Sequence, residues 1–143
     1  MKYIFAANNG GHLTEALEVM RLLAIKFDEC LIITEYGEHL KYRNYFFVSP
    51  FLGNPIKTTS AAIKLFFKIL MYRPNVVITT GAEVGVIVSY ISKILWNPKL
   101  IFIETFNRKI THTESLKMLH RIADEIIVQS KFNNEYNYLG ELI

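Results

Sequence analysis

The sequence has 143 residues, of which 51% are hydrophobic, 20% charged and 13% aromatic, so it predicts one well-packed globular domain rather than a disordered chain. The formal net charge of +3 is a smaller excess than a dedicated nucleic-acid binder usually carries, and we expect no nucleic-acid partner. With a single cysteine, Cys30, the chain can form neither a disulfide framework nor a cysteine-based metal site, and we interpret Cys30 as a buried core thiol.

Targeting and membrane-spanning segments are not predicted. Met1 and Lys2 lead directly into an apolar, β-prone run, without the long apolar region of a secretory signal. No segment reaches the roughly 18 uninterrupted apolar residues that a spanning helix needs. We therefore expect the chain to stay on the cytoplasmic side.

Short apolar runs alternate along the chain with segments of helical period. In chain order, the pattern predicts a strand at residues 3–7, a helix at 13–27, strands at 31–34 and 45–48, a helix at 59–73, a strand at 76–80, a helix at 83–95, a strand at 100–103, a helix at 113–122 and a strand at 126–128. In the first helix the expected core stripe is Leu13, Ala16, Leu17, Met20, Leu23, Ala24 and Phe27, with Thr14, Glu15, Glu18 and Arg21 facing water.

The strands are continuous apolar runs, which indicates that helices cover both faces of the sheet. Strands that alternate with helices predict right-handed crossovers. We therefore predict an α/β protein with a Rossmann-like, doubly wound parallel sheet, in one domain over residues 1–143.

The first strand is joined to the first helix through Asn9, Gly10 and Gly11. Glycine permits a sharp turn and lets a ligand approach the backbone, and a helix N-terminus favours an anion, so these residues are candidates for binding a diphosphate. A plain strand-to-helix turn is the alternative. The third glycine of the dinucleotide-binding motif is absent, and so is a Walker A motif. The helix dipole favours a neutral imidazole at His12, which is either a general base or phosphate ligand, or a solvated polar residue.

Two further loops carry polar residues at strand ends. Gly81 precedes a predicted helix, and Glu83 in its first turn either belongs to the site or compensates the helix dipole. Glu104 follows a buried strand and can accept hydrogen bonds from sugar hydroxyls, while Arg108 can pair with phosphate oxygens. Because ligands bind at the carboxyl ends of parallel strands, we expect these loops to share one site with residues 8–12.

The helix predicted at residues 59–73 has more apolar surface than packing on a sheet requires. One arc suffices for that packing: Ala61, Ala62, Leu65, Phe66, Ile69 and Leu70. A second arc of Ile63, Phe67 and Met71 borders Lys64 and Lys68, with Lys57 and Arg73 at the ends. An apolar face with a cationic rim suits docking to an anionic bilayer, where each cation adds roughly 1 kcal/mol. A buried core helix or a subunit interface is the alternative.

Three histidines, His39, His112 and His120, lack metal-ligand spacing, and we interpret them as surface or structural residues. We expect neither a metal nor a cofactor.

Four segments together resemble a known family. They are residues 9–13 (NGGHL), 78–83 (ITTGAE), 101–108 (IFIETFNR) and 127–129 (IVQ). Their order and spacing resemble the PssD/CpsF-like polysaccharide-biosynthesis proteins of bacteria. These are similar to the membrane-anchoring subunit of the eukaryotic enzyme that adds the second N-acetylglucosamine to dolichyl-diphosphate-GlcNAc.

The resemblance implies the N-terminal half of a GT-B glycosyltransferase, made as a separate polypeptide. A partner subunit would supply the C-terminal half, which binds the UDP-sugar. This half would recruit the partner to the cytoplasmic face of the plasma membrane, as a peripheral protein. It would present a polyprenyl-diphosphate-linked saccharide for capsular or exopolysaccharide biosynthesis.

The chain is also similar to the N-domain of the peptidoglycan GlcNAc transferase, whose glycine turn and histidine correspond to Gly10, Gly11 and His12. This similarity implies that His12 acts as the catalytic base and that Glu104 contacts acceptor or donor. Thr105 stands where many relatives have serine, which preserves a hydroxyl. The transmembrane anchor of the eukaryotic member has no counterpart here, so membrane attachment would depend on the helix at residues 59–73. The alternatives are a non-catalytic adaptor that anchors and activates its partner, and a soluble nucleotide-binding Rossmann module.

Overall fold

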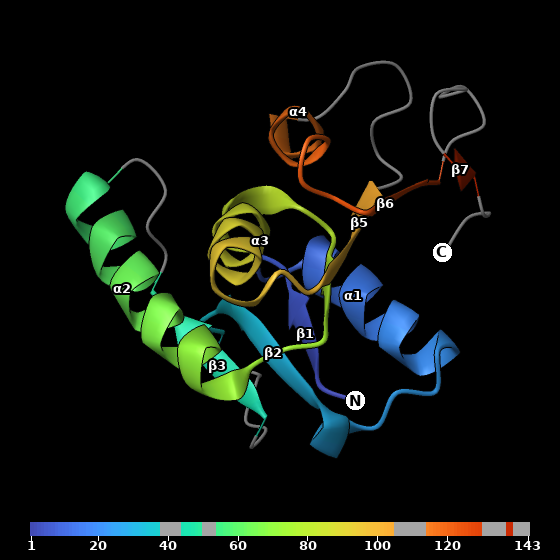
Figure 1. Cartoon of the computed structure of the whole chain (residues 1–143), viewed down its shortest axis with the longest axis horizontal. Coiled ribbons are helices and arrows are strands. Elements are labelled where there is room, and N and C mark those ends of the chain that lie inside the picture. Colours follow the sequence, from blue (N-terminus) through green and yellow to red (C-terminus); the bar gives the residue numbers. More distant parts are fainter. Residues whose placement is uncertain (38–43, 50–53, 105–113, 130–136, 139–143) are drawn as a thin grey trace.

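The computed structural model describes residues 1–37, 44–49, 54–104, 114–129 and 137–138. These residues form seven strands: β1 Tyr3–Ala6, β2 Cys30–Glu35, β3 Tyr45–Val48, β4 Val76–Thr79, β5 Lys99–Glu104, β6 Glu125–Val128 and β7 Asn137–Tyr138. The helices are α1 Gly11–Leu22, α2 Pro55–Tyr72, α3 Ala82–Trp96 and α4 Glu114–Leu119, with a short 3-10 helix η1 at Phe27–Glu29. The strands pair in parallel in the order β3-β2-β1-β4-β5-β6-β7 (Figure 1), which confirms the predicted α/β sheet.

The order of the strands reverses between β1 and β4. From β1 the chain moves outward through β2 to β3, and then returns to the other side of β1. Ala6 is level with Thr79 in the register of these two strands, so both chains leave the sheet at the same height. In an open parallel sheet this reversal opens a crevice at the carboxyl ends of the strands, where ligands bind.

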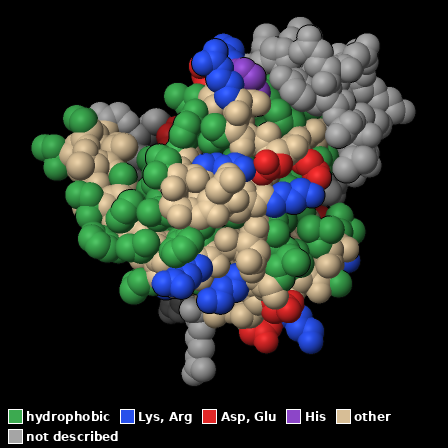
Figure 2. Space-filling view, in the orientation of Figure 1, with side chains coloured by type: hydrophobic (Ala, Val, Ile, Leu, Met, Phe, Trp, Pro, Cys, Tyr) green, Lys and Arg blue, Asp and Glu red, His purple; other side chains and the backbone are tan. Residues whose placement is uncertain are grey.

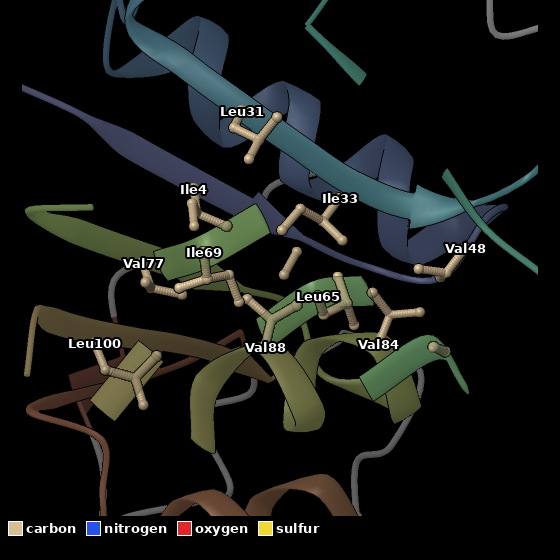
Figure 3. Close-up of a cluster of buried hydrophobic side chains, with 12 residues drawn as sticks. Ile4, Leu31, Ile33, Val48, Leu65, Ile69, Val77, Val84, Val88 and Leu100 are labelled. Atoms are coloured by element: carbon tan, nitrogen blue, oxygen red, sulfur yellow. The ribbon is translucent and has the colours of Figure 1, made fainter. Parts of the chain in front are cut away.

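Helices cover the two faces of the sheet unequally. One core cluster joins β1, β2 and β4 to α2 and α3; in Figure 3 strand residues such as Ile4 and Ile33 face Leu65 and Ile69 of α2 and Val88 of α3. The second cluster lies on the opposite face, where α1 packs through Leu13, Ala16, Val19 and Met20. Figure 1 shows β1 between α1 on one side and α3 and α2 on the other. The strands are therefore buried on both faces, as their continuous apolar runs predicted.

The first helix is shorter than its sequence period predicted. It ends at Leu22, and Ala24 turns the chain with a positive φ of 52°. Leu23 and Phe27, expected in the core, are exposed, and Phe27 opens η1 instead. Glu15, expected to face water, is buried. The left-handed turn interrupts the helical period, so the later residues of the stripe no longer share a face with Leu13.

Helix α2 begins four residues before its predicted start. The Asn54 side chain caps it by accepting the Lys57 N–H at 3.0 Å, and Pro55 stands at the first helical position, where a missing N–H costs nothing. Its buried positions are Ala61, Leu65 and Ile69. Phe66 and Leu70, predicted to pack on the sheet, are exposed, because only one stripe of residues four apart faces the core.

Candidate functional site

The loops after β1 and β4 are held together by side-chain hydrogen bonds. Asn8 Oδ1 accepts the Val84 N–H at 3.0 Å, and Asn8 Nδ2 donates to Glu83 Oε2 at 2.8 Å. The His12 ring Nδ1 lies 3.0 Å from the backbone carbonyl oxygen of Thr80. The side-chain hydroxyl of Thr80 in turn donates to the His12 carbonyl at 2.8 Å. Residues about 70 positions apart in the chain thus form one edge of the crevice.

Both helices that start at this edge begin from a glycine of the same unusual conformation. Gly10 precedes α1 with φ 101° and ψ −142°, and Gly81 precedes α3 with φ 90° and ψ −148°. This region of backbone space is essentially restricted to glycine. The two glycines singled out in the sequence therefore set the direction in which each helix leaves the sheet.

The N-terminus of α3 is satisfied by the protein itself. The Gly81 N–H donates to Thr79 Oγ1 at 3.0 Å and the Ala82 N–H to Ser115 Oγ at 2.9 Å, while the Val84 N–H is bound by Asn8. A Cβ on Gly81 would lie 3.1 Å from Phe102 and Ser115, so this turn is closely packed. Sequence reasoning missed Ser115, which lies in α4 and reaches the turn only through the fold.

The N-terminus of α1 is different. It has no side-chain cap and no acidic residue in its first turn. Among the described residues, no atom would lie within 4 Å of a Cβ added to Gly10 or Gly11. Asn9 folds back so that its Oδ1 accepts the Gly10 N–H at 2.9 Å. Of the two helix starts at the crevice, α1 is therefore the one open to an anion.

Glu35, a carboxylate that the sequence analysis missed, lies at the end of β2 beside this turn. Burial, and then repulsion by Glu83, raise the pKa of Glu35, while hydrogen bonds from the Asn8 side chain and the Asn9 N–H oppose that rise. A carboxyl group with a raised pKa in a crevice is a candidate functional residue. The rule of polar residues at strand ends, which selected Glu104, would have found it.

The remaining predicted residues lie farther away or outside the described part. Glu104 is buried at the end of β5, and its carbonyl accepts a hydrogen bond from Gln129 Nε2 at 3.2 Å. Strand β4 separates β5 from β1, which places Glu104 roughly 10 Å to the side of the α1 turn. Arg108, His39 and His112 lie outside the described residues. Within the described part, no cluster of three His, Cys, Asp or Glu side chains could hold a metal ion.

The outer face of α2 forms an apolar surface. Phe67 is 57% exposed and Met71 73%, and Ile63 lies beside them. At the end of α3, Ile94 is 79% exposed, and the ring of Trp96 stacks against the guanidinium of Arg73, the residue after α2, at 4.9 Å. Figure 2 shows hydrophobic side chains gathered over α2 at the left of the view.

The stretch of sequence that contains α2 carries charge of one sign. Six Lys and Arg and no Asp or Glu lie between residues 39 and 82, whereas the rest of the chain has ten Lys and Arg against thirteen Asp and Glu. Lys64 is exposed, and the Lys68 ammonium lies 5.5 Å from the Phe46 ring. No helix in the described ranges has the length and hydropathy to cross a membrane.

Several solved structures share this fold. The crystal structure of Acinetobacter baumannii MurG matches 99% of this chain with a TM-score of 0.70 at 16% identity, over 45% of its own length. UDP-GlcNAc 2-epimerase from Methanocaldococcus jannaschii matches 92% with a TM-score of 0.69 at 14% identity, over 40% of its length. The lipopolysaccharide outer-core galactosyltransferase WaaB matches 94% of this chain with a TM-score of 0.62 at 11% identity, over 41% of its own length. The chain thus spans less than half of these proteins and has the fold of the N-terminal half of a GT-B glycosyltransferase.

The sequence identifies the family within this class. Residues 41–140, more than two thirds of the chain, match the family described as oligosaccharide biosynthesis protein Alg14 like. The chain belongs to this family. The matched range begins after the glycine turn at residues 9–13, so that turn is interpreted from its geometry. No curated protein matches the sequence significantly.

Proposed function

We propose that this chain is the acceptor-binding and membrane-recruiting subunit of a two-component GT-B glycosyltransferase. The enzyme transfers a sugar from a UDP-sugar to a polyprenyl-diphosphate-linked saccharide, in capsular or exopolysaccharide biosynthesis. The observation that carries the proposal is the open N-terminus of α1 next to the half-buried His12, at the switch point of the sheet. Membership of the Alg14-like family and the half-length match to MurG support it.

The diphosphate of the acceptor binds at the start of α1. Asn9, Gly10 and Gly11 form the turn that exposes the first N–H groups of the helix, whose dipole favours the negative charge. Arg108 adds a cation to the same anion. Gly81 and Glu83 complete the site from the side of α3, because Glu83 holds Asn8 and Gly81 lets the turn before α3 pack against Phe102 and Ser115.

His12 acts as the general base of an inverting transfer. Its Nε2 takes the proton of the acceptor hydroxyl as that oxygen forms a bond to the anomeric carbon of the donor. The bond from this carbon to the diphosphate of UDP breaks, and UDP leaves with the electron pair. Glu104 accepts hydrogen bonds from sugar hydroxyls. The subunit that completes the GT-B fold binds the UDP-sugar.

Turnover by the reconstituted pair of subunits tests the catalytic assignment. His12→Ala and Glu104→Ala are expected to lower kcat by about 100-fold or more, the scale of a lost general base, without loss of partner binding. If turnover survives in both variants while the partner still binds, the chain is a non-catalytic adaptor that anchors and activates its partner. The chain by itself is expected to form no product with UDP-sugar and acceptor, because in this proposal the partner subunit binds the donor.

The acceptor site can be tested separately from folding. Gly11→Ala adds one methyl group at the first helical residue, where the described structure leaves space, so the chain should fold normally. The same methyl group would occupy the space that the diphosphate needs. We expect weaker binding of a short-chain prenyl diphosphate, measured by titration calorimetry; unchanged binding would contradict a diphosphate site at this turn.

The surface formed by Ile63, Lys64, Phe67, Lys68 and Met71 docks on the anionic cytoplasmic leaflet of the plasma membrane. Exposed apolar side chains enter the interface, and the cations pair with lipid headgroups. Liposome flotation with Lys64 and Phe67 both changed to glutamate should show loss of binding. Leu22→Glu, which replaces one exposed apolar residue of α1 by glutamate on the other face of the sheet, should still float with the liposomes. Flotation of the double variant would exclude α2 as the docking surface.

A further inference from the structure

We infer that Thr80 is the positioning residue for His12: the turn after β4 holds the imidazole with its proton on Nδ1, so that Nε2 is the basic nitrogen. The inference rests on the proposed role of His12 as general base, and it names the residue that orients that base. Its evidence is a pair of hydrogen bonds between two residues 68 positions apart.

The first hydrogen bond determines the tautomer. His12 Nδ1 lies 3.0 Å from the Thr80 carbonyl oxygen. A carbonyl can only accept a hydrogen bond, so Nδ1 must carry the proton. In the neutral ring the lone pair is then on Nε2, for which the described residues provide no hydrogen-bonding partner. This nitrogen is the one that a substrate hydroxyl can reach.

The second hydrogen bond fixes the position of the ring. The Thr80 hydroxyl donates to the His12 carbonyl at 2.8 Å, so the same residue holds both the backbone and the imidazole of His12. Thr80 is itself almost completely buried. Its neighbour Thr79 is anchored on β1, because Thr79 Oγ1 donates to the Ala6 carbonyl at 2.8 Å. The position of the imidazole therefore depends on β4 rather than on a mobile surface turn.

This arrangement suits a base better than a phosphate ligand. When Nε2 takes the proton of the acceptor hydroxyl, the ring becomes positively charged, and the hydrogen bond from Nδ1 to the Thr80 carbonyl becomes charge-assisted. The Thr80 carbonyl, which accepts from Nδ1, also keeps the ring in one orientation. In metal-bound histidines the hydrogen-bond partner of the nitrogen that does not bind the metal has the same effect. A neutral histidine that donated to phosphate from Nε2 would have its unprotonated Nδ1 facing the Thr80 carbonyl oxygen, which can only accept.

Nitrogen NMR of the whole chain, labelled with 15N at its histidines, tests the tautomer directly. We expect the neutral His12 ring to carry its proton on Nδ1 and none on Nε2. A proton on Nε2 in the wild-type chain would overturn the inference, whatever the behaviour of any variant. This measurement needs neither the partner nor activity.

Variants of Thr80 test its positioning role. Thr80→Val keeps the carbonyl and the shape of the side chain but removes the hydroxyl that holds the His12 backbone. Because the ring can then move away from the carbonyl, we expect both tautomers of His12 and a kcat about 10- to 100-fold lower in the two-subunit enzyme at unchanged KM. Thr80→Ser should restore the single Nδ1–H tautomer of His12 and the wild-type kcat. Thr14→Val is the matched control. The Thr14 hydroxyl donates at 3.2 Å to the Gly10 carbonyl in the same turn and does not contact the His12 ring. In this variant the His12 tautomer should be that of the wild type.

The outcomes separate this inference from the proposed function. If Thr80→Val keeps the Nδ1–H tautomer and the wild-type kcat, Thr80 does not position His12. If instead the tautomer is as expected but His12→Gln retains full turnover, the ring is oriented as inferred and the catalytic role of His12 is wrong.

Discussion

Gly10 and Gly11 are adjacent, yet the structure gives them different roles. Gly10 has the glycine-only conformation that turns the chain into α1, whereas Gly11 begins the helix and has open space around it. We expect Gly10→Ala to lower the free energy of unfolding by about 1–3 kcal/mol through backbone strain. Gly11→Ala should be neutral or stabilising by up to about 1 kcal/mol, because alanine favours a helix. Urea denaturation of the two variants measures both values, and equal destabilisation would contradict the assigned turn.

Glu35 makes stability depend on pH. Burial and the charge of Glu83 raise its pKa in the folded chain, so the folded chain holds this proton at pH values where the unfolded chain has released it. The contribution of Glu35 to the free energy of unfolding is therefore fully present below the ordinary pKa of glutamate. It is lost as the pH rises through the raised pKa of the folded chain. Glu35→Gln has no such loss. The free energy of unfolding of the Glu35→Gln variant, minus that of the wild type, should increase as the pH rises from the ordinary pKa of glutamate to the raised pKa, and then level off.

Glu83→Gln provides a second measurement of the same effect. This change removes the repulsion but leaves an oxygen that can still accept from Asn8 Nδ2. The pH dependence of unfolding should become weaker than in the wild-type chain. A pH dependence equal to that of the wild type would show that Glu83 does not influence Glu35.

Helix α3 lies unusually close to the sheet because of Gly85. A Cβ at this position would overlap Thr79 Oγ1 and approach the Ala6 carbonyl to 3.4 Å. Thr79 Oγ1 bonds both Ala6 on β1 and the Gly81 N–H at the start of α3. Gly85→Ala should therefore destabilise the chain by about 1–3 kcal/mol through overpacking, although alanine favours a helix. A stabilised Gly85→Ala variant in thermal unfolding would contradict this close approach.

Strands and helices of this protein were predictable where local patterns decide them. Continuous apolar runs identified six of the strands, and glycines followed by helical period identified the starts of α1 and α3. The end of α1 was not predictable, because apolar residues at helical spacing continue past Leu22 while the chain turns away. The raised pKa of Glu35 was not predictable either, because it comes first from burial and then from the charge of Glu83, and both depend on the fold.

The whole molecule has a surface suited to one orientation on a bilayer, and Trp96 can report it. Trp96 is the single tryptophan of the chain and lies where α3 ends, beside Arg73, the residue that follows α2. If α2 and the end of α3 dock together, anionic vesicles with brominated acyl chains should quench Trp96 emission and shift it to shorter wavelength. Vesicles of zwitterionic lipid should have much less effect, because the cations would lack their partners.

The quenching experiment has a control within the chain. The variant with Lys64 and Phe67 both changed to glutamate leaves Trp96 in place but removes a cation and an apolar side chain from α2. Its emission should not respond to the vesicles. A response equal to that of the wild type would mean that Trp96 approaches the bilayer by a surface other than α2.

The sequence by itself determined the class of fold, the two glycine turns and the excess apolar face of the helix that became α2. These features depend on neighbours a few residues apart, through strand hydrophobicity, glycine conformation and helical period. The tertiary structure alone decided which helix start is open to an anion. Sequence offers glycine turns before both α1 and α3, but only the folded chain brings Ser115 and Asn8 to the N–H groups of α3. It also decided the orientation of His12, because the carbonyl that accepts its ring proton comes from Thr80, a residue that only the pairing of β1 with β4 places beside it.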